Sequence, residues 1–447
     1  MNKTVCIIGL GYVGLTLAVA VANAGFKVHG VERSAHIRDA VARGHAHFSE
    51  KGLDQELGKH VDAGNIWCTE ELPKPGACSI FVITVGTPLT KDGAINLASL
   101  EEVLRGVTRT IHDGDLVILR STVKAGTSRS IAKRMLDESG RDYDLAFCPE
   151  RTLEGKALLE LSQLPQVVGG LTPRATENAG AFFARISPKI LAVDSLEAAE
   201  LVKLVNNTQR DLMFAFANEI AEMCDATGVS VTQLIRAACE DYPRSKIPMP
   251  GPVGGPCLEK DPHILAEGLR EVAYVPQISL AGRRLNEELP RSSITRMGKL
   301  LSSLGIEDMR GRKISILGLA FKGVPETDDL RGTMAAHILE AARARWPNAR
   351  YCAFDPIVQH DQYSQFELDV CPTLQDAFDG STLVIIQNNH RAFNEMRLAE
   401  LMTRMESTAL VYDYWNLFDT ATVPRQSNRH YAGLGNTHRV SAQVNID

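Results

Sequence analysis

The sequence predicts an α/β protein in which two doubly wound parallel sheets are joined by a long helix. Short apolar runs alternate with helix-like segments in both the first and the last third of the chain. Between them, apolar residues recur at helical spacing from Leu196 to about Gly228 with no internal proline or glycine. At 447 residues the chain is too long for a single core of ordinary size, so we expect two or three domains.

The first α/β region is defined by short apolar runs, which lie at residues 4–8, 26–31, 79–85, 116–119 and 145–148. Such short, nearly continuous runs are typical of strands buried on both faces of a parallel sheet. A glycine-rich turn follows the first run and leads into an apolar helical pattern at residues 13–24.

The second half continues from the long helix into a segment rich in proline and glycine at residues 242–256, which predicts a loop. A second helical stretch is expected from about residue 261 to 304. Strand character then returns at 313–320 and recurs at 350–354, 383–386 and 409–412. This alternation predicts a second α/β domain.

Charge and composition exclude several classes of protein. A net charge of −6 with interspersed signs provides no basic field, so we expect no nucleic-acid partner. No stretch approaches the roughly 20 apolar residues of a membrane span, and we expect no signal peptide before the first strand. Nine scattered cysteines without C-x-x-C spacing indicate reduced thiols in a cytoplasmic protein.

The turn after the first strand predicts a dinucleotide site. It reads Gly9, Leu10, Gly11, Tyr12, Val13 and Gly14, the G-x-G-x-x-G pattern between a strand and a helix. Its glycines allow a tight turn, close approach of the pyrophosphate, and close packing of the helix. Glu32 ends the second strand, where a carboxylate accepts hydrogen bonds from the ribose diol and repels a 2′-phosphate. We therefore expect NAD rather than NADP, although the adjacent Arg33 weakens that preference.

A cysteine after a glycine pair is a candidate nucleophile. Cys257 follows Gly254 and Gly255 and precedes Asp261 by four residues, at an expected helix start where amide groups would favour a thiolate. A lone cysteine is more often inert, so the context matters. Lys203 and Asn207 are four residues apart on the long helix and share a face, as do Asn218 and Glu222. A lysine and an amide together could stabilise an oxyanion, or could simply form a solvated stripe.

Several further motifs occur in a fixed order. They are V-G-T-P at 85–88, R-S-T-V at 120–123, C-P-E-R-T-L-E-G at 148–155, E-x-x-K-x-x-x-N at 200–207, N-E-I-A at 218–221, G-G-P-C-L-E-K-D at 254–261, G-L-A-F-K-G at 318–323 and D-D-L-R at 328–331. With these motifs the sequence resembles the UDP-glucose/GDP-mannose dehydrogenase family from about residue 3 to 434.

The resemblance implies how the chain is divided. We expect an NAD-binding Rossmann domain over residues 1–195 and a helical dimerisation domain with the cysteine loop over 196–305. A Rossmann-like domain that binds the nucleotide sugar would follow over 306–435, with a polar tail over 436–447. The resemblance also implies an NAD-dependent, four-electron oxidation of a sugar C6 alcohol to a carboxylate, with the aldehyde retained between the two steps.

The family's reacting groups transfer onto matching residues. Cys257 would attack the aldehyde to give a thiohemiacetal, which is oxidised to a thioester and then hydrolysed. Lys203 and Asn207 would stabilise the oxyanion and contact the substrate. Asp261 would act in proton transfer during the first oxidation.

Other family residues concern water, cofactor and substrate. Thr122, Glu150 and Glu154 would position or activate water in hydrolysis, although the two carboxylates beside Arg151 could also be a surface ion cluster. Thr87 and Thr122 would contact the cofactor, unless they only end strands. The residues expected to bind the nucleotide sugar are Glu150, Lys203, Asn207, Gly254, Lys322 and Arg331, together with Arg244, which would reach the neighbouring subunit's site in a homodimer.

Two groups of features point to different sugars. The P-E-R segment at 149–151 and the compact segment 250–255 resemble the branch that acts on UDP-N-acetylhexosamines. Glu154 and the K-D pair at 260–261 resemble the UDP-glucose branch, and Pro256 departs from the histidine or serine common to both. We favour a UDP-N-acetylhexosamine, either the gluco or the manno epimer, over UDP-glucose, with GDP-mannose third.

Two other classes of function are compatible with parts of the sequence. A catalytically silent module that binds NAD or a nucleotide sugar would have no use for the cysteine, lysine and asparagine together. A single-step hydroxyacid dehydrogenase would share the first domain and the long helix, but would not use the Cys257 loop or the second α/β half.

Overall fold

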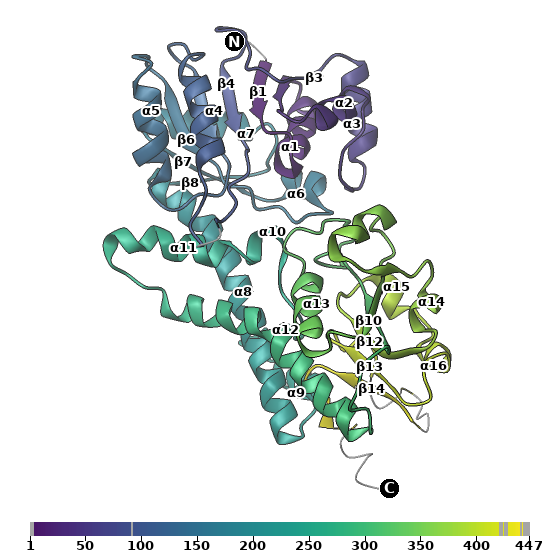
Figure 1. Ribbon diagram of the computed structural model, residues 1–447. Coiled ribbons are helices and arrows are strands. Elements are labelled where there is room, and N and C mark those ends of the chain that lie inside the picture. Colours follow the sequence, from purple (N-terminus) through teal and green to yellow (C-terminus); the bar gives the residue numbers. More distant parts are fainter. Residues whose placement is uncertain (1–3, 91–92, 420–422, 424–427, 439, 441–447) are drawn as a thin grey trace. The chain divides into compact units, whose positions relative to one another are not determined.

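The computed structural model describes residues 4–90, 93–419, 423, 428–438 and 440 (Figure 1). The chain forms two compact units, of which the first comprises residues 1–207 and 260–276 and the second residues 208–259 and 277–447. Each unit is built around one parallel or nearly parallel sheet with helices packed on it. This confirms the predicted α/β class with two doubly wound sheets.

The sheet of the first unit has the order β3-β2-β1-β4-β5-β6-β7-β8 and is parallel except between β6 and β7. Its strands are β1 Thr4–Ile8, β2 Lys27–Val31, β3 Ile66–Thr69, β4 Ile80–Ile83, β5 Leu116–Leu119, β6 Asp144–Phe147, β7 Gln166–Gly170 and β8 Ile190–Val193. The strand order reverses between β1 and β4, and the crevice at the carboxyl ends of such neighbours is where open α/β sheets bind ligands.

The sheet lies between two layers of helices, because successive residues of a strand face opposite sides. Val5 and Ile7 of β1 join one apolar cluster, whereas Cys6 and Ile8 join another. The helical segments of the first unit are α1 Tyr12–Asn23, α2 Ala35–Ala42, α3 Leu53–Asp62, α4 Ala98–Thr108, η1 Ser128–Lys133, α5 Arg134–Asp137, α6 Ala157–Gln163, α7 Pro173–Phe183, α11 Asp261–Leu269 and η2 Arg270–Val272.

The sequence predicted five of these strands and missed β3, β7 and β8. The missed strands β3 and β8 are the two edges of the sheet, and most of their residues are partly exposed. The third, β7, ends in two glycines. β8 nevertheless reads I-L-A-V, an apolar run as long as that of β5, so the sequence pattern gives no reason for its omission.

The sheet of the second unit is parallel throughout, in the order β11-β10-β9-β12-β13-β14. Its strands are β9 Lys313–Leu317, β10 Arg350–Phe354, β11 Asp369–Val370, β12 Ser381–Ile386, β13 Ala409–Asp413 and β14 Arg429–Gly433. Its helical segments are α9 Val231–Cys239, α10 Gly255–Leu258, α12 Gln277–Ser303, α13 Met334–Arg345, η3 His360–Phe366, α14 Leu374–Phe378, α15 Arg391–Asn394 and α16 Leu398–Met402. The predicted return of a strand–helix alternation is confirmed.

The long helix is α8, a single element of 32 residues from Leu196 to Thr227. The expected second helical stretch over 261–304 is wrong as one helix, because it breaks between η2 and α12. Ala273 adopts a left-handed conformation there, and Pro276, which lacks an amide hydrogen, follows before α12 begins at Gln277.

Most of the tail expected over 436–447 lies outside the described residues. Within the described part, Asn436 and Thr437 are buried, and Thr437 donates hydrogen bonds from its backbone amide and its hydroxyl to Asp225 of α8. No helix in the described ranges combines the length and apolar character that a membrane crossing requires.

Candidate active site

The glycine turn lies at the carboxyl ends of β1 and β4, where open α/β sheets bind ligands. Gly9 has a φ of +88°, a conformation that favours glycine. A Cβ on Gly14 would lie 1.9 Å from the carbonyl oxygen of Gly9, so the start of α1 packs directly on the turn. A Cβ on Gly11 would meet nothing within 4 Å, which leaves room for a pyrophosphate. The turn fits the predicted dinucleotide.

Glu32 is held in place by backbone amides. Its carboxylate accepts hydrogen bonds from the amide of Leu10 at 2.9 Å and from the amide of Ser34 at 3.0 Å. Arg33 is exposed, whereas Arg38 donates to the carbonyls of Glu32 and Arg33. A carboxylate anchored beside the glycine turn suits a ribose diol. Sequence reasoning missed Arg38 because it lies on α2, outside the motif.

Tyr12 belongs to a network that the motif does not reveal. Its hydroxyl donates to the carboxylate of Glu50 and accepts a hydrogen bond from the amide of Gly155 at 2.9 Å. Glu50 also accepts from the amide of Ala157 at 2.9 Å. Burial and the Glu50 charge raise the pKa of Tyr12, so its hydroxyl stays protonated. The network fixes the 154–157 segment, and hence Glu154, against the start of α1.

The loops after β4 and β5 carry Thr87 and Thr122. The buried hydroxyl of Thr87 donates to the Thr122 carbonyl at 2.5 Å, and Lys260 donates to the Thr87 carbonyl at 3.0 Å. The hydroxyl of Thr84 donates to the Gly9 carbonyl at 2.6 Å, which joins the end of β4 to the glycine turn. Thr87 and Thr122 are thus brought together beside the crevice.

Glu150, after β6, is buried in an ion pair with Arg120, whose guanidinium contacts its Oε2 at 2.5 Å and 3.1 Å. Arg120 is itself buried and donates to the carbonyls of Cys148 and Pro149 and to Gln166. Burial alone would raise the pKa of Glu150, but the charges of Arg120 and Lys203 and a hydrogen bond from Thr152 outweigh it, so the net pKa is lowered. Glu150 is therefore an ionised carboxylate, not a surface group.

Three predicted residues meet where α8 and α11 pack together within the first unit. Asn207 donates to Oδ2 of Asp261 at 2.6 Å, and Asp261 is completely buried. Burial raises the pKa of Asp261, although Lys203, Lys260 and Asn207 oppose the shift. Among the described residues, Oδ1 of Asp261 has no hydrogen-bond partner. A buried carboxylate with a raised pKa and an unsatisfied oxygen is suited to accept a proton.

The positive charge of Lys203 acts on both carboxylates. It helps to lower the pKa of Glu150, and it offsets part of the rise that burial causes in the pKa of Asp261. Lys203 is buried, and within the described ranges its ammonium makes no hydrogen bond or ion pair. A buried ammonium with unused donors can bind an oxyanion.

Glu200, the first residue of the E-x-x-K motif, anchors the loop after β5. Its carboxylate accepts hydrogen bonds from the amide of Gly126 at 2.6 Å and of Ser128 at 2.7 Å. Burial raises the pKa of Glu200 to about 7, against the opposing effect of these amides. Glu200 therefore fastens the segment that carries Thr122 to α8, one turn before Lys203.

Cys257 lies in the second unit, in the short helix α10, and its side chain is partly exposed. The glycines before it pack on the loop that precedes α13. The amide of Gly255 donates to the carbonyl of Gly332 at 2.6 Å, and a Cβ on Gly254 would lie 2.3 Å from that same oxygen. Larger residues at these positions would displace the cysteine.

A buried polar network holds the cysteine loop to α8 and α12. Arg283 donates to Asp211 at 2.8 Å and to the carbonyl of Leu258, the residue after Cys257, at 3.1 Å. Asn218 of the N-E-I-A motif bonds both the amide and the carbonyl of Gly251. The sequence did not predict that Arg283 and Asp211 belong to this network. Arg283 lies 72 positions from Asp211 and 25 positions from Leu258, and no sequence pattern links residues so far apart.

The other predicted residues of the second unit lie near this loop's partners or on the surface. Lys322 stacks over the ring of Phe321, which in turn lies against Gly255. Arg331 is largely exposed and pairs with Asp329. Arg244 is exposed and stacks on Tyr242 at 4.7 Å. Groups of at least three residues able to hold a metal ion do not occur in the described part of the chain.

The structure thus brings the predicted residues together in two sets. The first unit joins the glycine turn and Glu32 in one crevice, and gathers Thr87, Thr122, Glu150, Lys203, Asn207 and Asp261 around the carboxyl ends of β4 to β6 and the start of α8. The second unit holds Gly254 and Cys257 against the loop that contains Lys322 and Arg331. The chain passes from the second unit to the first between Glu259 and Lys260, directly after the cysteine helix.

Comparison with known proteins gives three consecutive matches to models of the UDP-glucose/GDP-mannose dehydrogenase family. The NAD-binding domain matches residues 3–187, the central domain residues 197–288 and the UDP-binding domain residues 315–420. A UDP-N-acetyl-D-mannosamine dehydrogenase of Yersinia pestis is 31% identical over 413 residues, which cover 88% of this chain and 95% of that protein.

Solved structures show the same likeness. The UDP-D-ManNAc dehydrogenase of Pyrococcus horikoshii matches with a TM-score of 0.86 and 28% identity over 97% of this chain and 99% of that one. A UDP-glucose dehydrogenase of Pyrobaculum islandicum matches with a TM-score of 0.83 and 26% identity over 97% of each chain. Enzymes named for different sugars therefore share this fold.

Proposed function

Because the chain belongs to the UDP-glucose/GDP-mannose dehydrogenase family, we propose that it is an NAD⁺-dependent enzyme that oxidises C6 of UDP-N-acetyl-D-mannosamine to a carboxylate. The observation that carries this choice of sugar is the 31% identity over 88% of the chain to a dehydrogenase named for that substrate. The P-E-R segment at 149–151 supports the same branch. UDP-glucose is the second candidate, because the fold is shared with a UDP-glucose dehydrogenase.

The cofactor site is assigned to the glycine turn with Glu32, and bound NAD⁺ there would accept a hydride. The open space beside Gly11 supports this assignment, as does the anchored carboxylate of Glu32, which suits a ribose diol and repels a 2′-phosphate. Thr87 and Thr122 would line the nicotinamide end, since Thr87 follows β4, which pairs with β1, and donates to the carbonyl of Thr122 after β5.

In the first oxidation, C6 loses a hydride and its hydroxyl loses a proton. We assign the proton to Asp261, whose pKa is raised by burial and whose Oδ1 has no partner among the described residues. Asn207 holds the other carboxylate oxygen at 2.6 Å and so fixes its orientation. Lys203 would stabilise the developing alkoxide.

In the second oxidation, the Cys257 thiolate adds to the aldehyde carbon and forms a C–S bond. The resulting thiohemiacetal loses a second hydride to become a thioester, and water then cleaves the C–S bond, releasing the carboxylate and restoring the thiol. The balance is one alcohol, two NAD⁺ and one water giving one carboxylate, two NADH and three protons.

Hydrolysis requires a positioned water. Glu150 has a lowered pKa and is committed to Arg120, so its proposed role is to orient Lys203 and the water rather than to take a proton. Glu154, carried on the segment that Tyr12 and Glu50 hold in place, is the carboxylate proposed to accept that proton.

We also propose a homodimer in which Arg244 reaches the partner subunit's site. Large apolar side chains are exposed along one face of α8, with Val205 at 51%, Phe216 at 54% and Met223 at 59% exposed. Val205 and Phe216 are 11 positions apart and Phe216 and Met223 are 7 positions apart, and both spacings keep side chains on one face of a helix. Light scattering of purified protein should give twice the monomer mass of 48.8 kDa. Phe216→Glu should reduce it to the monomer, and a wild-type monomer would contradict the proposal.

The sugar is identified by counting NADH. Purified protein with NAD⁺ and, separately, UDP-ManNAc, UDP-GlcNAc, UDP-glucose and GDP-mannose should form two NADH per molecule of UDP-ManNAc. Cys257→Ala should lose the second oxidation, while the matched change at another partly buried cysteine, Cys68→Ala, should not. Two NADH from UDP-glucose alone would change the assigned substrate to that sugar. No NADH from any donor would contradict the proposed dehydrogenase activity.

The role of Asp261 has a separate test. Asp261→Asn should block oxidation of the alcohol but still oxidise the corresponding 6-aldehyde, because the second oxidation begins from the Cys257 thiolate. Equal loss of both reactions would contradict the assignment of Asp261 to the first proton transfer.

A further inference from the structure

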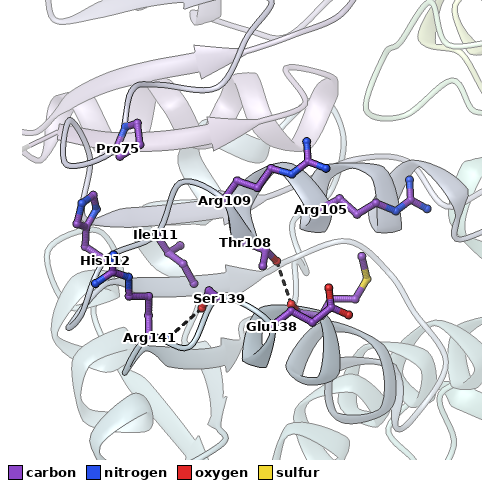
Figure 2. A pocket seen from close by; sticks show the side chains of 10 residues that line it. Pro75, Arg105, Thr108, Arg109, Ile111, His112, Glu138, Ser139 and Arg141 are labelled. Carbon is purple, nitrogen blue, oxygen red and sulfur yellow. Dashed lines mark hydrogen bonds between the residues drawn. The ribbon is translucent and has the colours of Figure 1, made fainter.

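A cavity of about 610 Å³ opens on the first unit, away from the residues discussed so far (Figure 2). It is lined by Pro75, Arg105, Thr108, Arg109, Ile111, His112, Met135, Glu138, Ser139 and Arg141. Its volume is within the roughly 300–1,000 Å³ of small-molecule pockets.

The cavity and the dinucleotide site lie at opposite ends of the strands of the first sheet. Pro75, His112 and Arg141 belong to the segments that enter β4, β5 and β6, so they mark the amino ends of these parallel strands. The glycine turn follows β1 and therefore lies at the carboxyl ends. A ligand in this cavity would not compete for the crevice that holds Gly9 and Glu32.

Basic residues outnumber acidic ones in the lining, with three arginines and a histidine against one carboxylate. Arg105 and Arg109 are four residues apart on α4 and share a face. Arg141 is in the segment beside His112, because Asp113 pairs with Arg141 and the amide of Gly114 bonds the carbonyl of Asp142. Figure 2 shows His112 and Arg141 at one end of the cavity and Arg105, Arg109 and Glu138 toward the other.

The arginines and His112 have unused hydrogen-bonding capacity. Arg105 and Arg141 approach Glu101 and Asp113 only to 3.7 Å, beyond hydrogen-bond distance. In the described part of the chain, the Arg109 guanidinium has no ion pair or hydrogen bond, and Nδ1 of His112 is buried without a partner. By contrast, the guanidinium of Arg129, on a nearby segment of the same unit, makes two hydrogen bonds to Glu197. Guanidinium groups with free donors match the geometry of phosphate oxygens.

We propose that this cavity binds a phosphate ester of a polyhydroxylated small molecule, a sugar phosphate or a nucleoside monophosphate. His112 and Arg141, at one end of the cavity, would hold the phosphate, and Arg105 and Arg109, toward the other end, would donate hydrogen bonds to the sugar hydroxyls. The carboxylate of Glu138 would repel a bare polyanion but can accept hydrogen bonds from sugar hydroxyls. The hydroxyls of Thr108 and Ser139 already donate to backbone carbonyls, so the charged side chains set the specificity.

Isothermal titration tests the site with saturating NAD⁺ present, so that the glycine turn is already filled. The probes are glucose 6-phosphate, AMP, glucose and inorganic phosphate. One equivalent of glucose 6-phosphate or of AMP should bind the wild-type protein, and whichever binds identifies the source of the phosphate ester. Glucose should not bind, and inorganic phosphate should bind more weakly than the ester.

Arg109→Met with Arg141→Met should weaken that binding at least tenfold. Arg134→Met, an exposed arginine on α5 outside the cavity, should leave it unchanged. Both variants should retain the wild-type rate of NADH formation, since none of the three arginines belongs to the proposed reacting set, and this rate reports that the unit is folded. The proposal would be overturned if neither glucose 6-phosphate nor AMP gave a measurable heat of binding, or if the double variant bound the ester as tightly as the wild-type protein does.

Discussion

Replacing Arg120 with methionine removes the cation from the buried ion pair with Glu150. The side chains of Arg120 and Glu150 are 1% and 6% exposed, and the guanidinium makes two hydrogen bonds to the carboxylate and three to neighbouring acceptors. Breaking such a pair leaves an uncompensated charge in the interior, which costs about 3–5 kcal/mol. Since a domain's whole stability is about 5–15 kcal/mol, this loss should be large.

The matched control is Arg129→Met. Arg129 also makes two hydrogen bonds to a carboxylate, that of Glu197, but the two side chains are 49% and 31% exposed. Exposed pairs contribute about 0–1 kcal/mol, because water screens both charges. The two variants therefore delete similar hydrogen bonds and differ in burial.

Hydrogen–deuterium exchange of peptides from β5 and β6, measured on the full chain, reports the opening free energy of this unit alone. We expect Arg120→Met to lower it by about 3–5 kcal/mol and Arg129→Met by about 1 kcal/mol or less. Changing both partners, Arg120→Met with Glu150→Leu, should cost less than Arg120→Met, because no charge is left unpaired. A cost for Arg120→Met within 1 kcal/mol of the control would refute this reasoning.

The same pair has a defined pH dependence. In the wild-type protein the folded-state pKa of Glu150 lies below its unfolded value, so its stabilisation is present above the unfolded pKa and is lost as pH falls through the folded pKa. In Arg120→Met, burial is no longer balanced by Arg120, and the pKa of Glu150 should rise. Acid then protonates the stranded carboxylate, and the stability gap between variant and wild type should narrow as pH falls.

Three further perturbations follow from the geometry of the first unit. Gly14→Ala places a Cβ 1.9 Å from the Gly9 carbonyl oxygen, so fluorescence titration should detect a loss of NAD⁺ binding. Gly58→Ala, on α3, is the control, because its Cβ would approach only the Gly44 carbonyl oxygen, at 3.7 Å, and it should bind NAD⁺ as the wild type does. Glu32→Ala removes a charged hydrogen-bond acceptor worth roughly 1.5–3 kcal/mol, so the KM for NAD⁺ should rise while that for NADP⁺ falls; an unchanged ratio of the two would contradict the assignment. Glu200 has its pKa raised to about 7, so the folded state binds its proton more tightly than the unfolded state and this contribution to stability is lost as pH rises through about 7. In the wild-type protein the thermal midpoint should therefore fall as pH rises from the ordinary glutamate pKa to about 7. Glu200→Gln should remove this fall, and an unchanged fall in the variant would assign the pH dependence to another group.

Contiguous residues let the sequence alone predict much of this protein. The first strand, the glycine turn and the start of α1 lie within residues 4–14, so the spacing that binds a dinucleotide is set by local backbone geometry. The strands at the centre of each sheet were also predictable, because burial on both faces demands a continuous apolar run. Lys203 and Asn207 were placed on one face of α8 by helical periodicity alone.

Only the tertiary structure decided which distant side chains these elements bring together. Arg120 lies 30 residues from Glu150, Glu200 lies 72 residues from Ser128, and Asp211 lies 72 residues from Arg283. Each of these pairs is buried, so its members determine one another's charge state and orientation, yet no periodicity links positions so far apart. Tertiary structure also decided that β3 and β8 form the edges of the first sheet. The break before α12 escaped prediction because a helical pattern in the sequence can continue past its own interruption. The sequence determined the chemical groups and their local geometry; burial against distant partners determined which of them are ionised, anchored or left with an unsatisfied oxygen.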